Sequence, residues 1–460
     1  MFSLENGSKV KLEIRKMGIN GEGIGYFNRL AIFVPRAITK EIVNCEIVEL
    51  YDKYAVAKLE EVVKPSNRRV EPPCKFYEQC GGCQLQHVEY KEQLKAKLSL
   101  LKQSLSRYTS LDIASLKIRK ALGLANNYHY RNKSQRPFKN TNFGLALGLF
   151  RQGTNQFVYV DTCMTEDEHV NQINQEALTV LRKYHVMASD QMNKEGILLN
   201  LVTRYLASTE TASVTFIVTD FDPVLKEVAK DLMAKNPSVV SVTYSVNKKN
   251  NPMMFGPAVE LLAGKPYITD LFSNMKIRIS PDAFHQLNTA QMKVLYDEIV
   301  KAAELEGKET VIDAYSGIGM TSLMMARKAK RVIGIDYSPA SIADATKNAT
   351  ANGIKNVSFI CDHVEGALPK LIANGVKPDI LVLDPPRAGL PEEIVKLIVK
   401  TKIKKIIYVS CNPSTLAKNI AGLESKYEVC YIQPLDMFPH TANVESVTLL
   451  KLKESGGANR

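Results

Sequence analysis

From about residue 280 onward, short apolar runs typical of strands alternate with helical stretches. The strand-like runs are TVIDAY (310–315), RVIGID (331–336), SFICD (358–362), DILVLD (379–384) and KIIYVS (405–410). Strands that alternate with helices are typical of a parallel sheet covered by helices on both faces. The pattern therefore predicts a doubly wound α/β domain over residues 276–460. Ligands of such domains bind at the carboxyl ends of the strands.

A glycine turn, Ser316-Gly317-Ile318-Gly319, follows the first of these strands, and the second strand ends at Asp336. A glycine-rich turn with an acidic residue about 20 positions later is typical of sites for ribose-bearing cofactors. The turn lacks the third glycine of the NAD fingerprint and favours the D-x-x-x-G-x-G turn of S-adenosylmethionine methyltransferases. Asp336 is expected to bind the ribose hydroxyls, and a structural capping role is the alternative.

Two further strand ends carry reactive side chains. Asp384-Pro385-Pro386 follows the fourth strand and resembles the substrate loop of methyltransferases that act on amino groups of bases. Those enzymes need no cysteine, yet the next strand ends at Cys411, where Asn412-Pro413 prevents the strand from continuing. A lone cysteine is more often a small buried hydrophobic residue than a nucleophile. The position of Cys411 at a strand end is what raises the second possibility.

The loop MFPHTANVE carries His440 and Glu445 and leads into a last strand. Cys411 and Glu445 thus lie at the ends of different strands and are expected to face one pocket. One reaction that needs both groups is methylation at C5 of uracil, a carbon that is a poor nucleophile. A thiolate adds to C6 and thereby activates C5, and a base later removes the C5 proton. We therefore predict Cys411 as the nucleophile and Glu445 as the base. His440 and Arg387 are candidates for polarising the site.

Cys74, Cys80 and Cys83 are spaced C-x5-C-x2-C, and Cys163 is the best candidate for a fourth ligand. Cysteines in a protein without a secretion signal indicate metal binding or catalysis rather than disulfides. Four thiolates bind either zinc or an iron–sulfur cluster, and the x5 spacing favours the cluster. His87 is a possible substitute ligand, and three unrelated thiols are the alternative. Cys45 is predicted to lie in a core.

Residues 1–62 contain short alternating runs separated by glycines and predict a small β-barrel of about five strands. Residues 63–275 predict a central α+β domain, with a basic amphipathic helix from Tyr90 to Ser106 and another helix over 223–235. Cations interleaved with aromatic rings suit single-stranded RNA, although a solvated strand face is an equal alternative. The candidate RNA contacts are Arg131, Lys133, Arg136 and Phe138.

The net charge of +12 also favours a polyanionic partner. No apolar run approaches the ~20 residues of a membrane span, and the first residues lack the pattern of a signal peptide. We therefore expect a cytoplasmic protein, without membrane contact.

Three segments, S-C-N-P-S-T-L-A-K-N, L-D-P-P-R-A-G and F-P-H-T-A-N-V-E-S, resemble the signatures of RNA (uracil-5-)-methyltransferases. The similarity covers nearly the whole chain and is greatest to the bacterial branch that acts on 23S ribosomal RNA. In the barrel, G-x-N-G-E-G-I-G-Y resembles a TRAM domain. The resemblance implies an RNA-binding barrel, a Rossmann-like catalytic domain and 5-methyluridine as the product.

The resemblance also implies roles for individual residues. Cys411 corresponds to the nucleophile and Glu445 to the proton acceptor. The positions that bind S-adenosylmethionine correspond to Gln286, Tyr315, Asp336 and Asp384. The ligands of a [4Fe–4S] cluster correspond to Cys74, Cys80, Cys83 and Cys163. Asn443 stands where the family often has histidine, and Met320 where a polar residue is common.

The expected activity is thus methylation of a uridine in 23S rRNA by a monomer. Methylation of a tRNA uridine is the alternative within this class, and amino-methylation of a base is a second enzymatic alternative. An iron–sulfur RNA-binding sensor with an inactive methyltransferase fold is the non-enzymatic one. That last hypothesis predicts loss of Cys411, Glu445 or the glycine turn, and all three are present.

Overall fold

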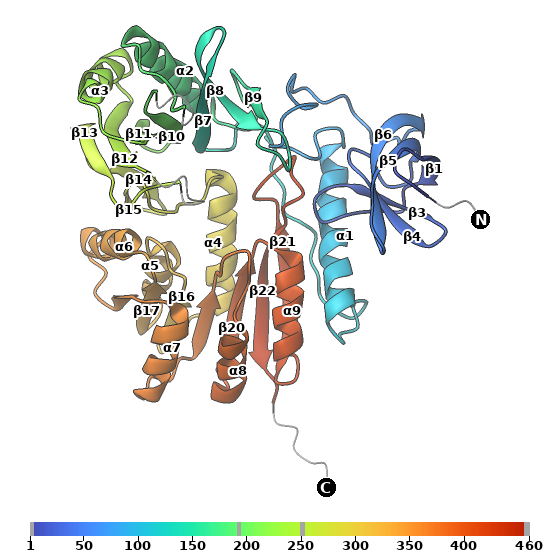
Figure 1. Cartoon of the computed structure of the whole chain (residues 1–460). Coiled ribbons are helices and arrows are strands. Elements are labelled where there is room, and N and C mark those ends of the chain that lie inside the picture. Colours follow the sequence, from blue (N-terminus) through green and yellow to red (C-terminus); the bar gives the residue numbers. More distant parts are fainter. Residues whose placement is uncertain (1–3, 191–194, 249–253, 455–460) are drawn as a thin grey trace.

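The computed structural model describes residues 4–190, 195–248 and 254–454, which form a small barrel, a central domain and a catalytic domain (Figure 1). Each of the three parts has an apolar core. Within these described ranges, no helix is both long and apolar enough to cross a membrane.

The N-terminal barrel has six strands where about five were expected. They are β1 (Lys9–Glu13), β2 (Lys16–Met17), β3 (Gly23–Phe27), β4 (Leu30–Val34), β5 (Ile42–Leu50) and β6 (Tyr54–Lys64), in the order β1-β5-β6-β4-β3-β2. Alternate residues of β1 and β5 are buried, as expected for strands with one face on a core. Cys45 lies in this core, as predicted.

The central domain is a seven-stranded sheet with two helices packed on it. Its elements are β7 (Lys133–Thr141), β8 (Gly144–Phe150), β9 (Phe157–Tyr159), α2 (Glu168–Lys183), β10 (Leu198–Leu206), β11 (Thr211–Val218), α3 (Val224–Lys235), β12 (Val239–Val246) and β13 (Glu260–Gly264). The strand order is β13-β12-β11-β10-β7-β8-β9. Helix α3 confirms the helix predicted over 223–235.

The catalytic domain is the predicted doubly wound sheet, in the order β18-β17-β16-β19-β20-β22-β21. Its elements are α4 (Thr289–Ala303), β16 (Thr310–Ala314), α5 (Met320–Ala326), β17 (Arg331–Asp336), α6 (Pro339–Ala351), β18 (Val357–Cys361), α7 (Val364–Ala373), β19 (Ile380–Leu383), α8 (Glu392–Thr401), β20 (Lys405–Ser410), α9 (Pro413–Leu423), β21 (Tyr427–Leu435) and β22 (Glu445–Leu452). The first five strands are parallel, and β22 is antiparallel to both neighbours. The chain reverses its direction of winding between β16 and β19, which is where ligands bind in such sheets.

Both predicted limits of the central domain, 63 and 275, need correction. Helix α1 (Tyr90–Tyr108) packs against α9, and its residues Leu101 and Leu105 belong to the catalytic core. The hairpin β14 (Ile268–Phe272) and β15 (Met275–Ile279) also packs on the catalytic domain, beside α6. The amphipathic pattern of α1 indicates a buried face, but it does not identify the distant helix that covers it.

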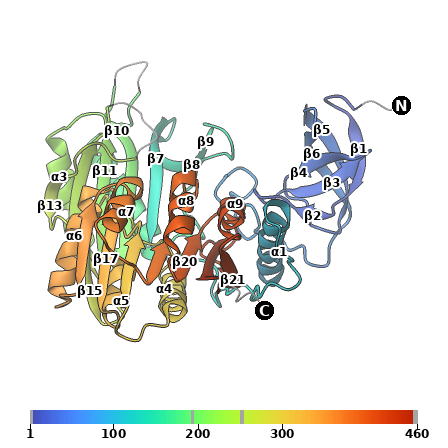
Figure 2. The same cartoon turned by 90° about the horizontal axis from the view of Figure 1, so that it is seen from below.

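Helix α1 lies between α9 and the barrel (Figure 2). A small apolar cluster joins the barrel, α1 with the segment before it, and the loop before β22. It consists of Met17, Ile38, Leu85, Val88, Leu100 and Val444, with Ala96 packed on it. The barrel is therefore fixed to the catalytic domain through α1 and the loop that precedes β22.

Candidate active site

A left-handed turn follows β16 at the point, between β16 and β19, where open α/β sheets have their ligand crevice. Tyr315, Gly317 and Gly319 have φ angles of 67°, 53° and 86°. A Cβ atom at Gly319 would lie 2.9 Å from the ring of Phe359, so a larger residue would have to displace that ring. This turn brings backbone N–H groups to the carboxyl end of the sheet.

Asp336, at the end of β17, holds this turn. Its Oδ2 accepts a hydrogen bond from the N–H of Gly317, and its Oδ1 accepts one from the N–H of Ser338, both at 2.9 Å. The side chain therefore has the capping role considered as an alternative. Each carboxylate oxygen has a second lone pair, so this role leaves Asp336 able to accept a hydroxyl group as well.

Two more carboxyl groups lie close together in the crevice. Burial raises the pKa of Asp384, after β19, to about 7. Burial, followed by the charge of Asp384, also raises the pKa of Asp313 on β16 to about 7, although the Ser322 hydroxyl donates to it at 2.5 Å. Asp313 was missed as a site residue in the sequence. The sequence could have indicated it, because Asp313 is the first residue of the D-x-x-x-G-x-G turn.

Cys411 and Glu445 lie at the adjoining ends of two paired strands. In the antiparallel ladder Ser410 of β20 is opposite Ser446 of β22, so the next position places Cys411 beside Glu445. The two groups interact electrostatically. Asn412 does more than stop the strand, because its side chain accepts a hydrogen bond from the N–H of Ser414 at 3.0 Å and begins α9.

Burial disfavours the charged form of both reactive groups. Burial, then the charges of Glu445 and Asp384, raise the pKa of the Cys411 thiol to about 11, while Arg387 acts in the opposite direction. Burial, then Asp384, also raise the pKa of the Glu445 carboxyl well above its usual range. A buried pair of acids of this kind avoids two adjacent negative charges.

Of the two candidates for polarising the site, Arg387 lies beside it and His440 does not contribute. Arg387 donates a hydrogen bond to the side chain of Asn443 at 3.4 Å. The ring of His440 is bonded on one side to Gln93 and on the other to Asn127. His440 therefore joins α1 to the catalytic loop, and the expectation that it polarises the substrate is wrong.

Gln286 is buried on the loop before α4, and Asn132 holds this loop in place. The Asn132 side chain donates to the carbonyl of Gln286 at 3.1 Å, and its N–H donates to the carbonyl of Leu287 at 2.8 Å. The neighbouring Phe284 has 63% of its surface exposed, which is unusual for a phenylalanine. Phe284 was not among the site residues predicted from the sequence, although it belongs to the segment A-F-H-Q-L-N that also contains Gln286.

Three other positions near the crevice have structural explanations. Met320, one of the two departures, is buried in the apolar core, so its side chain replaces no polar contact with a ligand. His363 stacks on the exposed ring of Tyr337, with ring centroids 5.5 Å apart. The Cys361 thiol donates weakly to the carbonyl of Tyr337.

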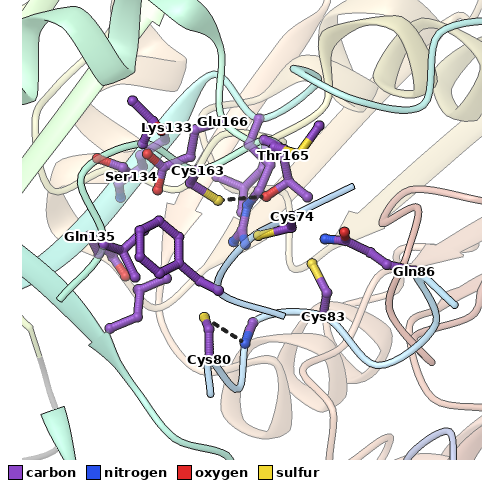
Figure 3. A pocket seen from close by; sticks show the side chains of 18 of the residues that line it. Cys74, Cys80, Cys83, Gln86, Lys133, Ser134, Gln135, Cys163, Thr165 and Glu166 are labelled. Atoms are coloured by element: carbon purple, nitrogen blue, oxygen red, sulfur yellow. Dashed lines mark hydrogen bonds between the residues drawn. The ribbon is translucent and has the colours of Figure 1, made fainter. Parts of the chain in front are cut away.

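The four predicted cysteine ligands line one cavity of about 330 Å³, and their sulfur atoms point into it (Figure 3). Burial, together with the smaller effects of the other three thiols, raises the pKa of Cys83 to about 12. Among the described residues, no three His, Cys, Asp or Glu side chains are arranged to hold a single metal ion. His87 lies outside this cavity and bonds to the Tyr77 hydroxyl at 2.6 Å, so it is not a substitute ligand.

Two of the four predicted RNA contacts are wrong. The guanidinium of Arg136 is buried in an ion pair with Glu166 at 2.6 Å, and Phe138 belongs to the core of the central domain. Arg131 and Lys133 are partly exposed and line the same cavity as the cysteines. Even-numbered positions of β7 face inward, which removes Arg136 and Phe138 from the surface together.

Comparison with known proteins identifies the chain. Residues 89–453 match the tRNA (Uracil-5-)-methyltransferase family, and residues 3–59 match the TRAM domain. The chain belongs to the tRNA (uracil-5-)-methyltransferase family. The predicted enzyme class, and the α/β methyltransferase fold with an N-terminal TRAM domain, are confirmed. The roles assigned to individual residues remain predictions.

Relatives of this methyltransferase extend over almost its whole length. An uncharacterized RNA methyltransferase of Listeria innocua is 41% identical over 97% of this chain and 98% of its own. One of Bacillus anthracis is 39% identical over 98% of both chains. The structure of the Pyrococcus abyssi tRNA (uracil-54, C5)-methyltransferase with S-adenosyl-L-homocysteine is similar, with a TM-score of 0.76 and 26% identity, over 96% of this chain and 100% of that one.

Proposed function

We propose that this methyltransferase transfers a methyl group from S-adenosylmethionine to C5 of a uridine in 23S rRNA, as a cytoplasmic monomer. The observation that carries the proposal is the pairing of Cys411 and Glu445 at the adjoining ends of β20 and β22. A nucleophile and a base side by side are what C5 methylation of a uracil requires. An amino-methyltransferase needs neither.

In the first step, the sulfur of Cys411 forms a bond to C6 of the uracil, and the C5=C6 electron pair moves to C5 and the O4 enolate. The thiol first gives up its proton, which passes to solvent, and Arg387 favours the thiolate. Bound S-adenosylmethionine supplies an electrophilic methyl group, which C5 takes up. Glu445, whose own proton has passed to solvent once the substrates are bound, then accepts the C5 proton as a carboxylate. The C5=C6 bond re-forms, and the C6–sulfur bond breaks to free Cys411 as a thiolate.

The crevice between β16 and β19 provides groups that fit S-adenosylmethionine. The Asp336 carboxylate would hold the ribose hydroxyls, since its oxygens have free lone pairs. Tyr315, in the left-handed turn, and Asp384, after β19, lie at the carboxyl ends of the two strands, and Gln286 lies on the loop before α4. The positions of these groups at the carboxyl ends of the strands support the assignment.

We also propose that Cys74, Cys80, Cys83 and Cys163 hold a [4Fe–4S] cluster. In such a cluster each thiolate binds a different iron atom, so the sulfurs need not converge on one point. Four thiols that point into one cavity are the donor set that this group requires. We propose a structural role for the cluster. Anaerobic purification should yield iron and sulfide, and stoichiometric zinc without iron would contradict the proposal.

Methylation of a tRNA uridine is the second candidate, favoured by the similarity to the Pyrococcus abyssi tRNA enzyme. The combination of barrel and four cysteines supports ribosomal RNA instead. Unmodified 23S rRNA and tRNA transcripts, each incubated with labelled S-adenosylmethionine, distinguish the two. Methyl transfer to tRNA alone would replace the ribosomal assignment without changing the chemistry.

The decisive experiment is incubation with S-adenosylmethionine and a transcript containing 5-fluorouridine. Since fluorine cannot leave as a proton does, the protein–RNA adduct should persist on a denaturing gel. Cys411→Ala should form none, while Cys361→Ala, at an exposed cysteine near the crevice, should form as much as the wild type. An adduct with Cys411→Ala would exclude Cys411 as the nucleophile.

A further inference from the structure

A cavity of about 490 Å³ separates the barrel from α1, and we call it the barrel–helix groove. Its floor is apolar and buried, and it consists of Met17, Ile38, Leu85 and Val88. Five cationic side chains lie along its walls: Arg15, Lys16, Lys40, Arg68 and Lys95. An apolar floor between positive walls suits a ligand that carries both uncharged rings and negative groups.

Three of these cations are not neutralised by a carboxylate. Arg68 pairs with Glu89 at 2.7 Å, and Lys95 pairs with Glu92 at 3.0 Å. Arg15, Lys16 and Lys40 form no ion pair with any residue that the structure describes. Glu92 is the one carboxylate on the groove's lining, so the groove is positive overall.

His87 adds an unused donor to the same groove. Its ring is buried, and the Tyr77 hydroxyl lies 2.6 Å from Nδ1. When that hydroxyl donates, Nε2 carries the proton, and Nε2 has no partner among the described residues.

The groove borders the catalytic loop. Val444, which precedes Glu445, packs in the same apolar cluster as the groove floor. The N–H groups of Gln84 and Leu85 both donate to the carbonyl of His440 at 2.9 Å. A strand of RNA with its uridine at Cys411 would therefore meet the entrance of the groove as it leaves the active site.

We propose that the barrel–helix groove binds the backbone of single-stranded RNA next to the target uridine. The phosphates would lie on Arg15, Lys16 and Lys40, and the riboses and bases would lie over the apolar floor. This inference rests on the proposed function for the identity of the ligand. It places the contact of the barrel in the groove, away from the exposed rings of Tyr51 and Tyr54 on its outer side.

Fluorescence anisotropy with a labelled 20-nucleotide oligouridine tests the proposal over a range of salt concentrations. Replacing Arg15, Lys16 and Lys40 together by alanine removes three phosphate contacts, so the log–log salt slope should fall by about 2 and the affinity by tenfold or more. The matched control replaces Lys355, Lys377 and Lys400, three exposed lysines of the catalytic domain, and should bind as the wild type does.

A second pair of variants fills the groove without changing its charge. Ser99 lines the groove on α1, whereas Ser106 is exposed on the same helix outside it. Ser99→Trp should weaken binding tenfold or more, and Ser106→Trp should leave it unchanged. Equal affinities for both tryptophan variants would overturn the proposal. Methyl transfer by the wild type is measured separately, so a groove that binds RNA without methylation would contradict only the proposed function.

Discussion

Burial is the main reason why Cys411 and Glu445 hold their protons tightly, and the neighbouring Asp384 is a further one for both groups. The thiol is surrounded by two carboxyl groups, so its ionisation adds a second negative charge to a buried site. The resting cysteine is therefore weakly reactive, which protects it against oxidation and alkylation. Arg387 is the neighbouring charge that favours the thiolate. RNA and cofactor must complete the activation.

Glu445→Gln is expected to trap the enzyme on its natural substrate. Without a base the C5 proton stays in place, so the bond between Cys411 and C6 cannot be released. A covalent protein–RNA adduct should accumulate with unmodified RNA and S-adenosylmethionine, and turnover should fall by a factor of about 100 or more. Denaturing gels measure both. Glu428→Gln, on β21, is the control, and free turnover by Glu445→Gln would exclude the role of base.

The pKa of about 11 predicts how the thiol reacts without substrate. Between pH 7 and pH 9 the thiolate fraction of Cys411 should rise about tenfold per pH unit. The rate of alkylation by iodoacetamide, followed by mass spectrometry of the peptide that contains Cys411, should rise in parallel. Glu445→Gln removes a neighbouring acid and should shift the profile to lower pH. A plateau near pH 8 in the wild type would contradict the prediction.

At the scale of elements, strand β16 carries a destabilising group at its centre. The carboxyl of Asp313 is buried, and its pKa of about 7 lies above the usual value of 3.8. The folded protein therefore keeps a proton that the unfolded chain releases between these two pH values. This contribution lowers the free energy of unfolding as the pH rises from about 4 to about 7, and the loss is complete above that range.

Asp313→Asn should remove this penalty. At pH 8 the variant should be more stable than the wild type by up to about 4 kcal/mol, and at pH 4 the two should be similar. Urea unfolding at both pH values measures the difference. Asp379→Asn is the control, and it should lower the free energy of unfolding at pH 8. Hydrogen bonds from Thr310 and Lys404 lower the pKa of Asp379 despite its burial, so its charged form stabilises the folded protein. Greater stability of Asp313→Asn at pH 4 than at pH 8 would refute the account.

The sequence predicted the catalytic elements well because their signals are local. Apolar runs ending in Asp336, Asp384 and Cys411 indicate both a strand and a site at its end. The signals failed where the partner is distant. From the sequence alone Arg136 is predicted to be a surface cation, because its ion-pair partner Glu166 lies on a separate segment. From the sequence alone His440 is a candidate for polarising the site, because Gln93 and Asn127, which bond to its two ring nitrogens, are distant in the chain.

At the scale of the whole molecule, α1 connects the barrel to the catalytic loop. Lys97 on α1 donates to Asp436 at 2.5 Å and to the carbonyl of Phe438 at 2.9 Å, and both charged side chains are buried. A buried ion pair is strongly destabilising when only one partner is removed. The pair therefore specifies where α1 lies on the catalytic domain.

Lys97→Met should lower the free energy of unfolding by about 3–5 kcal/mol, because Asp436 is left buried without a counter-ion. Lys97→Met combined with Asp436→Leu should recover most of the loss. Lys95→Met, at an exposed position of the same helix, should change the stability by less than about 1 kcal/mol. Urea unfolding of the three variants gives the comparison. An unchanged stability of Lys97→Met would show that the pair is not formed in solution.

The packing of α1 also has a consequence for how the protein is made. Gln93 on α1 contacts His440, which lies 347 residues later in the chain. At synthesis rates of about 5–20 residues per second, α1 waits about 20–70 s on the ribosome for this partner. The face of α1 that carries Leu101 and Leu105 lacks its catalytic-domain partners throughout that time, whereas the barrel residues that pack near Leu100 are made before it. Chaperone binding during translation should therefore concentrate on α1.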